Sequence, residues 1–429
     1  MADYDSQAGS LQRHLGVSQA VIIGVGSMVG AGVFAAWAPA ARAAGNGLLI
    51  GLAIAGAVAF ANATSSAQLA AVHPESGGTY VYGRLRLGPF WGYLAGWGFV
   101  VGKTASCAAM ALTVGAYLWP SHQRLAAVVA ILTITAVNLG GLSRTVAVTR
   151  VLLVVALAAL TAVVVGGWTG GSATLDRLTP IDANPLGVLQ SAGFLFFAFA
   201  GYARIATLGE EVRDPERTIP KAIPLALGGV LIVYTVVAVT ALATVDAAKL
   251  GASDAPLRLV ADSNGTIAVG GVVGVGAGVA ALGVLLNLIP GVSRTVLAMA
   301  RNRELPHGFA HIDQRRSLPL RAELTVAAIV IVLVVVLDLG HAIAVSGVAV
   351  LTYYAITNAA ALTLSLEQRR WPRAMAFGGL AGCLVLVVAL PPAAILGGFT
   401  TLAIGVVVRA VTLRRGQPRP PRDPISMFN

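Results

Sequence analysis

Apolar runs of roughly 18 or more residues recur along the chain, and each is long enough to cross a bilayer as a helix. Alternating strands of about ten residues, which are typical of membrane barrels, do not recur. Hydrophobic residues make up 57% of the 429 residues and charged residues only 11%, against roughly 25% charged in a soluble domain. The sequence therefore predicts an all-α polytopic membrane protein and excludes a water-soluble globular one.

Pro, Gly and charged residues divide the apolar runs into about twelve predicted transmembrane helices, with ends accurate to about four residues. The predicted helices cover residues 17–38, 47–72, 89–118, 124–142, 147–167, 186–209, 221–245, 266–292, 322–340, 343–365, 374–391 and 393–412. Only Pro391 and Pro392 separate the last two helices, so this boundary is the least defined.

The first ten predicted helices form two halves of five. The first half covers residues 17–167 and the second covers residues 186–365, and the loop between them, 168–185, is expected on the extracellular side. Two additional helices follow in residues 366–412. The domain organisation is completed by two end segments: a cytoplasmic N-terminal segment, 1–16, and a disordered cytoplasmic tail rich in Pro and Arg, 413–429.

Basic residues indicate the orientation of these helices. Most of the 29 Lys and Arg residues fall in loops that face the cytoplasm when the N-terminus is inside, which is the positive-inside pattern. The chain is therefore expected in the cytoplasmic membrane with both termini in the cytoplasm. The net charge of +11 reflects this topology, with contact to anionic membrane lipid as a consequence, and does not indicate nucleic acid binding.

The sequence predicts no cofactor, metal site or catalytic centre. All 18 acidic residues and all 6 His residues fall in loops or at the ends of predicted helices, without the clustering that metal ligands need. Cys107 and Cys383 lie inside apolar runs, where a thiol packs as a small hydrophobic group. These features argue against an enzyme.

Glycines interrupt the first predicted helix. Four of them occupy positions where a spanning helix usually carries Leu or Ile: Gly24, Gly26, Gly30 and Gly32. One interpretation is close packing between helices, through the spacing of Gly26 and Gly30. The other is a broken helix whose free backbone NH groups at Gly30 to Gly32 bind a carboxylate.

A second interruption lies in the sixth predicted helix, in the aromatic run from Phe196 to Tyr202 that contains Gly201. An aromatic cluster alone is more typical of packing than of a site. Here, however, the two interrupted helices each begin one of the five-helix halves. Interruptions at corresponding positions of two halves are the best sequence indication of the substrate site in an inverted-repeat transporter.

At these residues the chain resembles the amino acid-polyamine-organocation superfamily of secondary carriers. The resemblance covers roughly residues 10–412 and rests on GSMVGAGVF from Gly26, FFAFAGY from Phe196, EEVRDPERTIP from Glu210 and MARNRELP from Met299. It implies a leucine-transporter-type fold with a 5+5 inverted repeat. It also implies alternating access, with an amino acid held between the first and sixth helices.

The resemblance further implies which groups hold the substrate. Backbone NH groups around Ala31 and Gly32, directly after Gly30, are expected to take the carboxylate. The ammonium group is expected at four carbonyls, those near Met28, Phe197, Ala198 and Ala200. Tyr202, after Gly201, stands where the family has a gating aromatic residue.

Two charged positions depart from the family pattern. Family members often carry an Asp after the aromatic residue that follows Gly in the sixth helix, where this chain has Ala203 and Arg204. Some proton-coupled members carry a Lys in the fifth helix, but here residues 147–167 contain only Arg150. Arg204 precedes the acidic pair Glu210 and Glu211, so ion pairing at the cytoplasmic mouth and a gating role both stay open.

Lys103 lies in the middle of the third predicted helix, roughly 20 Å from either end at about 1.5 Å per residue. A Lys side chain cannot reach the membrane surface over that distance, so its ammonium group must face protein or internal water. The eighth helix offers few hydroxyls for a sodium site. The sequence therefore favours a proton as the coupling ion, exchanged at Lys103.

The predicted function is secondary active transport of amino acids. Because Asp and Glu fall in loops or at the ends of predicted helices and none lies near the middle of one, neutral substrates are favoured, with small ones such as alanine first. An uncoupled exchanger and a cationic amino acid transporter stay open. A membrane receptor or channel is the alternative from a different class of protein. A channel, however, more typically carries rings of charged side chains or carbonyls along its pore, and a receptor usually has an additional soluble domain.

Overall fold

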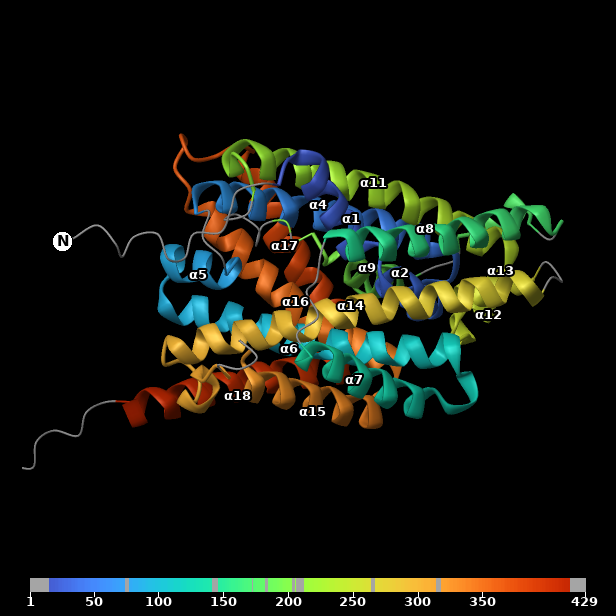
Figure 1. Cartoon of the computed structure of the whole chain (residues 1–429). Helices are drawn as coiled ribbons and strands as arrows, with labels where there is room; N and C mark the ends of the chain where they lie inside the picture. The colour runs from blue at the N-terminus through green and yellow to red at the C-terminus, as the bar shows by residue number, and fades with distance from the viewer. Residues whose placement is uncertain are drawn as a thin grey trace, which may run out of the picture.

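The computed structural model describes residues 15–73, 77–140, 146–171, 173–181, 184–202, 205, 212–263, 267–313 and 318–416. Within these residues every regular element is a helix, apart from two isolated bridges that join Leu15 to Val212 and Asp313 to Leu318. Figure 1 shows the long helices lying together as one bundle. The prediction of an all-α protein is confirmed.

The helices differ widely in length. Their bounds in chain order are α1 (Val17–Met28), α2 (Ala31–Ala35), α3 (Trp37–Ala44), α4 (Leu48–Val72), α5 (Thr79–Leu87), α6 (Pro89–Leu118), α7 (Gln123–Leu139), α8 (Val146–Thr169), α9 (Pro185–Phe199), α11 (Pro215–Thr244), α12 (Ala247–Ala252), α13 (Pro256–Asp262), α14 (Ile267–Arg301), α15 (Leu320–Val336), α16 (Leu339–Leu362), α17 (Arg373–Ala389) and α18 (Pro392–Gly416). Short 3-10 helices lie at Gly45–Gly47, Pro120–His122, Leu175–Leu178 and His307–Ala310.

Nine helical stretches of the described residues are long and apolar enough to cross a membrane. They are Val17–Ala35, Trp37–Val72, Pro89–Leu118, Pro120–Leu139, Arg150–Thr169, Pro215–Thr244, Val269–Arg301, Leu339–Leu362 and Pro392–Arg414. Two shorter apolar helices, α9 and α17, accompany them. The chain is therefore a multi-pass membrane protein, while the count of twelve helices stays a prediction.

The sequence prediction for the eighth helix, residues 266–292, is too short, because α14 continues to Arg301. Pro290 lies inside this helix, where it removes one backbone hydrogen bond. Val292 and Met299, beyond the proline, are fully buried. Packing of these side chains therefore keeps the chain helical past the point where the sequence indicates an end.

Helices from the two predicted halves interleave. α4 packs against α9 and α11, and α11 packs against α1. A second group joins α6 and α7 to α14 and α15. Each group therefore takes members from both halves, and α16 lies along α6 and α17.

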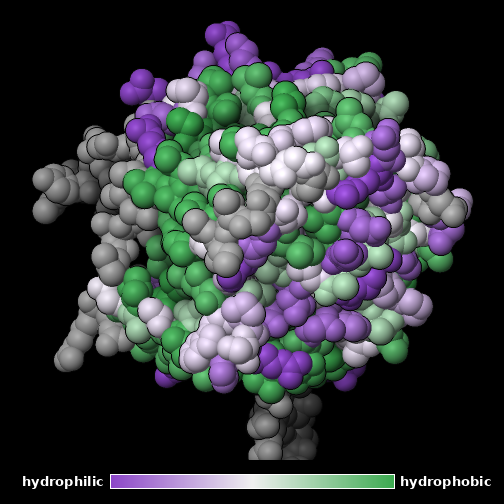
Figure 2. Space-filling model, turned by 90° about the vertical axis from the view of Figure 1, so that its right-hand side faces the viewer, coloured by the Kyte–Doolittle hydropathy of each residue, from purple (hydrophilic) through white to green (hydrophobic). Residues whose placement is uncertain are grey.

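Large hydrophobic side chains are exposed on the outer helices: Val154 is 65%, Ile232 68% and Val388 75% exposed. Apolar surface on this scale is expected where a protein contacts lipid. Figure 2 views the end of the bundle that lies on the right in Figure 1, and hydrophilic side chains gather on it with hydrophobic surface mainly along its margin. This distribution fits a bundle whose ends lie in water and whose sides lie in a membrane.

Candidate functional site

A break at Val29 and Gly30 separates α1 from α2. α1 ends at Met28 and α2 begins at Ala31, and the NH group of Gly30 donates to the carbonyl of Met28 at 2.8 Å. A Cβ atom on Gly30 would collide with the side chain of Val284 in α14. The helix is therefore broken where the sequence predicts, and Gly30 also permits close packing against α14. The NH group of Gly30 is taken up by Met28, so carboxylate binding stays a prediction for the NH groups of Ala31 and Gly32.

The second interruption follows α9, which ends at Phe199 and not near residue 209. Ala200, Gly201 and Tyr202 form a turn in place of a further helical turn. Tyr202 is fully buried, and its ring lies 5.1 Å from the ring of Tyr354 in α16. The helix therefore stops within the aromatic run that the sequence analysis identifies as an interruption.

The two interrupted segments touch each other. A Cβ atom on Gly201 would collide with the backbone of Ser27 and Met28, and one on Gly32 would lie 3.0 Å from the Cα atom of Ala198. Glycine at both positions is what allows backbones to approach so closely. We call this contact between residues 27–32 and 198–202 the crossing.

Side chains from neighbouring helices donate hydrogen bonds to the carbonyls of the crossing. The hydroxyl of Tyr234, in α11, lies 2.7 Å from the carbonyl oxygen of Met28 and 3.0 Å from that of Ala198. The hydroxyl of Tyr354 donates to the carbonyl of Ala200 at 3.3 Å. These carbonyls lie at helix ends, where the regular helical hydrogen-bond pattern stops. The carbonyl of Met28 accepts from the NH group of Gly30 in addition to Tyr234.

Lys103 also reaches the crossing. It lies within α6, and its ammonium nitrogen donates to the carbonyl of Ala200 at 3.4 Å. The side chain is partly buried and keeps some accessible surface. A cation in the middle of a transmembrane helix thus lies beside the carbonyls that the sequence analysis assigns to an ammonium group.

The other residues of the predicted site are described in part. The carbonyl of Phe197 accepts a hydrogen bond from the NH group of Ala200 at 3.4 Å, so it is turned toward its own chain. The predicted gate residues Arg204, Glu210 and Glu211 lie outside the described residues. Within the described residues, no group of three or more His, Cys, Asp or Glu side chains lies close enough to hold a metal ion.

Sequence reasoning missed Tyr234 and Tyr354. Tyr234 stands alone among aliphatic residues in the seventh apolar run, with no motif around it. The one available signal is its chemistry, because a phenol hydroxyl buried in a membrane needs an acceptor and marks a position near exposed backbone. Which backbone it meets depends on tertiary packing, and the sequence does not give that.

A polar cluster around Glu304 involves α5, which lies at the left of the bundle in Figure 1. Its carboxylate accepts hydrogen bonds from the Tyr80 hydroxyl at 2.6 Å and from Arg84 at 3.2 Å, and Arg409 lies 3.8 Å away. The side-chain amide of Asn302 donates to the Tyr80 hydroxyl at 2.7 Å. The cluster thus joins α5 and α18 to the segment that follows α14.

Burial raises the pKa of the Glu304 carboxyl above its ordinary value, although the hydrogen bond from Tyr80 and the charges of Arg84 and Arg409 lower it. The side chain of Glu304 is only 4% exposed. Burial, together with the hydrogen bond to Glu304 and its charge, raises the pKa of Tyr80 to about 12. A largely dehydrated carboxyl therefore lies between two arginines whose side chains are 40% and 16% exposed.

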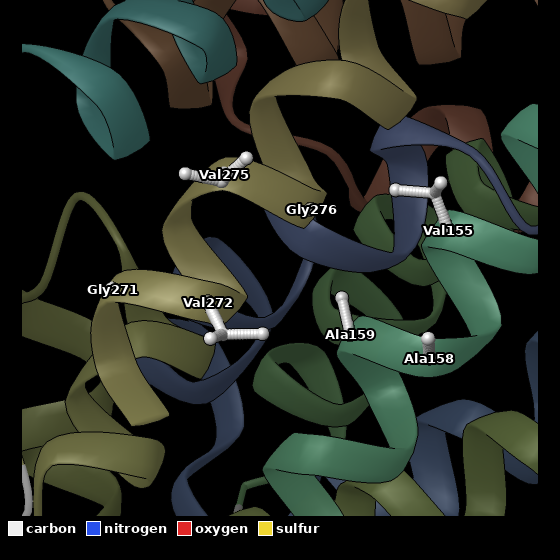
Figure 3. Close-up of a pocket in the computed structure, with 7 residues that line it drawn as sticks. All are labelled: Val155, Ala158, Ala159, Gly271, Val272, Val275 and Gly276. Carbon is white, nitrogen blue, oxygen red and sulfur yellow. The ribbon is translucent and has the colours of Figure 1, made fainter. Parts of the chain in front are cut away.

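A groove of about 530 Å³ between α8 and α14 lies away from the crossing. Figure 3 shows the residues that line it, which are aliphatic or glycine: Val155, Ala158, Ala159, Gly271, Val272, Val275 and Gly276. Val272 and Val275 are each 59% exposed. The groove offers no polar side chain to a zwitterion, so it suits lipid chains and not an amino acid.

Comparison with known proteins gives one family over most of the chain. Residues 15–414 match the amino acid permease family. An uncharacterized transporter of Mycobacterium tuberculosis is 56% identical over 411 residues, which are 95% of this chain and 93% of that protein. The branched-chain amino acid permease BcaP of Bacillus subtilis is 24% identical over 93% of this chain and 92% of its own length. The chloroplastic cationic amino acid transporter 7 of Arabidopsis thaliana is 27% identical over 79% of this chain and 63% of its own length.

Proposed function

The chain belongs to the amino acid permease family, and we propose that it is a secondary active transporter that moves amino acids across the cytoplasmic membrane by alternating access. The crossing is the observation that carries this proposal, because two interrupted helices far apart in the sequence meet there backbone to backbone. Interrupted helices present free NH and carbonyl groups within the membrane. These groups match the carboxylate and the ammonium group that every amino acid carries.

In the proposed site, the two interrupted helices bind different groups of the amino acid. NH groups of Ala31 and Gly32, after Gly30, bind the carboxylate, and Tyr202 beside Gly201 closes the site. The ammonium group is bound by the carbonyls of Met28, Phe197, Ala198 and Ala200. Three of these carbonyls accept hydrogen bonds from Tyr or Lys side chains, which supports the view that they point toward other parts of the protein and not along their own helices.

The proposed architecture is a leucine-transporter-type 5+5 inverted repeat, residues 17–167 and 186–365, with two additional helices and twelve in all. The interleaving of the two halves supports it, because each packed group takes helices from both. Arg204, Glu210 and Glu211 are proposed to gate the cytoplasmic mouth. Both termini are proposed to be cytoplasmic.

The coupling ion that we propose is a proton, exchanged at Lys103. This side chain contacts the crossing, so loss or gain of its proton changes the charge beside the substrate. A sodium site in α14 is disfavoured, because its polar side chains bond to their own helix. Asn287 donates to the carbonyl of Gly283 at 3.0 Å, and the Thr295 hydroxyl donates to that of Gly291 at 3.1 Å.

The substrates that we propose are small neutral amino acids. Among the described hydrogen bonds of the crossing, none involves a carboxylate. The side chain of a cationic substrate would need a carboxylate partner at this depth in the membrane. Bulky aromatic residues also limit the space, since Phe196, Phe199 and Tyr202 are fully buried beside the crossing. A relative named as a cationic amino acid transporter keeps cationic substrates as the second candidate.

Uptake of labelled alanine into proteoliposomes tests the proposal. We expect saturable uptake that the other small neutral amino acids compete for, and counterflow when the vesicles are preloaded with unlabelled alanine. Preferential competition by arginine or lysine would replace the neutral assignment with a cationic one. A receptor would bind without counterflow, and a full amino acid panel that gives no transport would refute a carrier.

A further inference from the structure

We propose that Tyr234 is a positioning residue for the substrate ammonium group, because its hydroxyl ties the two interrupted helices together and fixes the carbonyls of Met28 and Ala198. The inference rests on the proposed function, which gives those carbonyls their role. It adds a residue from α11 to a site otherwise built from the two interrupted helices. Tyr234 itself does not touch the substrate in this proposal.

The hydroxyl of Tyr234 lies between the two interrupted helices. Tyr234 is fully buried, and its single hydroxyl hydrogen lies within reach of two carbonyl oxygens, at 2.7 Å on Met28 and 3.0 Å on Ala198. The first carbonyl ends α1 and the second lies in the last turn of α9. One hydrogen-bond donor therefore links Met28 and Ala198, which lie 170 residues apart in the sequence.

The ring of Tyr234 is packed against aromatic side chains of α3 and α9. It meets Trp37, at the start of α3, edge to face with 6.2 Å between the ring centroids. Phe199, the last residue of α9, lies 5.0 Å away at an interplanar angle of 56°. Aromatic contacts of this kind restrict the ring, so the hydroxyl cannot turn to other acceptors without disturbing both helices.

The carbonyl chemistry leaves room for the substrate. A carbonyl oxygen has two lone pairs, so the carbonyl of Ala198 can accept from Tyr234 and still accept from an ammonium group. The carbonyl of Met28 accepts from both Tyr234 and the NH group of Gly30, so Tyr234 holds it in place beside the ammonium site. Tyr234 is neutral and adds no charge that would repel the substrate. Fixing the acceptors before the substrate arrives reduces the ordering that binding requires.

The test compares Tyr234→Phe with Tyr93→Phe. Tyr93 is an equally buried tyrosine in α6 whose hydroxyl donates to the carbonyl of Gly405, far from the crossing in sequence and in contact with α18. Both changes delete one buried hydroxyl and keep the ring. Inhibition of labelled alanine uptake is measured with unlabelled alanine and with N-methylalanine, which keeps the positive charge but has one fewer NH donor.

We expect Tyr234→Phe to raise the alanine inhibition constant about tenfold, the factor typical of one lost hydrogen bond. The inhibition constant of N-methylalanine should rise less, so the ratio of the two inhibition constants, which measures the preference for alanine, should become smaller. Tyr93→Phe should keep the wild-type preference. The proposal is wrong if Tyr234→Phe leaves the preference at the wild-type value, or if both tyrosine variants change it equally.

A third variant, Trp37→Phe, tests the proposal if Tyr234→Phe does not fold. If Tyr234→Phe cannot be purified as a single species, Trp37→Phe loosens the ring contact and keeps the hydroxyl, and it should narrow the preference to a smaller extent. A wild-type preference in Trp37→Phe would then overturn the proposal. Failure of the wild type to take up any amino acid would instead refute the proposed function, so the two failures are distinct.

Discussion

Gly32 and Gly201 determine how closely the interrupted helices approach, because a single methyl group on either would press on the neighbouring backbone. Close approach brings backbone NH and carbonyl groups, and not side chains, to the centre of the proposed site. Backbone groups recognise the parts that all amino acids share. Selectivity among amino acids is then left to the side chains around the crossing, such as Phe196 and Tyr202.

Replacing Gly30 or Gly32 by Leu is expected to abolish transport while membrane insertion stays largely intact. The new side chain would meet Val284 in the first case and Ala198 in the second, and it would fill the space proposed for the substrate carboxylate. Leu itself is favourable in a membrane helix, so insertion should not suffer. Uptake of labelled alanine and the yield of membrane-inserted protein are the two measurements.

Gly378→Leu is the matched control. A Cβ atom on Gly378, in α17, meets no other atom within 4 Å, so Leu should be accommodated there and uptake should stay near the wild-type rate. Normal uptake by both crossing variants would contradict a substrate site at the break between α1 and α2. Loss of uptake in all three variants would point to a general effect of Leu in place of Gly.

At the scale of helices, the Glu304 cluster joins parts of the chain that the predicted repeat does not connect. α18 lies outside both five-helix halves, yet Arg409 approaches Glu304 and stacks on Phe90 and Tyr93, with 5.9 and 5.2 Å to the two ring centroids. α5 joins the same carboxylate through Tyr80. α18 is therefore joined to the beginning of α6 and to the segment after α14.

Glu304→Gln tests the charge of this cluster. Because burial raises the pKa of Glu304 from 4.5, the folded protein binds a proton there at pH values where the unfolded chain has lost it. The free energy of unfolding contributed by this group is therefore highest at low pH and falls as the pH rises from about 4.5 through the raised pKa. Gln keeps an acceptor for the Tyr80 hydroxyl and removes the titration.

The measurement is the thermal midpoint in detergent between about pH 4 and 8. The stability of the wild type relative to Glu304→Gln should decline as the pH increases. Glu367→Gln, which makes the same change at an exposed carboxylate, is the matched control. A wild-type advantage that grows with pH would mean that the two arginines outweigh burial, and would reverse the assignment.

The helices were predictable to the extent that apolar runs define them. α6 begins and ends where the third predicted helix does, because Pro89 and the polar residues after Leu118 bound its apolar run. The interruptions were also predictable, since glycine in a membrane helix is an evident local signal. α14 was not, because its continuation beyond Pro290 depends on the burial of Met299 by other helices.

The proposed site was predictable in its backbone and not in its side chains. Glycine patterns and motifs indicate which segments are broken, but Tyr234 and Tyr354 come from helices without a motif. Their contacts arise when helices distant in sequence pack together. Lys103 was identified because its charge is exceptional in an apolar run, although its carbonyl partner, Ala200, was not.

At the scale of the whole molecule, proton coupling means that a pH difference across the membrane drives accumulation of the amino acid. Lys103→Ala is expected to weaken pH-driven accumulation of alanine much more than its equilibrium exchange. One proton per substrate can support about tenfold accumulation for each pH unit, and the variant should fall toward no accumulation. Accumulation ratios and exchange rates in the same proteoliposomes give the comparison.

Lys249→Ala, which removes an exposed cation from α12, serves as the control and should accumulate alanine as the wild type does. Equal losses of accumulation and exchange in Lys103→Ala would assign Lys103 to structure or substrate binding and not to coupling. Uptake by the wild type that depends on sodium would overturn proton coupling altogether.

The hydrogen bonds of Tyr234 also have a consequence for biosynthesis. α1 enters the membrane well before α9 and α11 are synthesised, so the carbonyl of Met28 at first lacks the hydroxyl that it later meets. Until then the bond from the NH group of Gly30 is the one that the first helix itself supplies to this carbonyl. A broken helix with incompletely satisfied backbone groups is costly in lipid, which favours retention of the nascent first helix beside the insertion machinery or water until the second half arrives. The first half expressed alone should therefore be degraded rapidly, and co-expression of residues 186–429 should extend its lifetime.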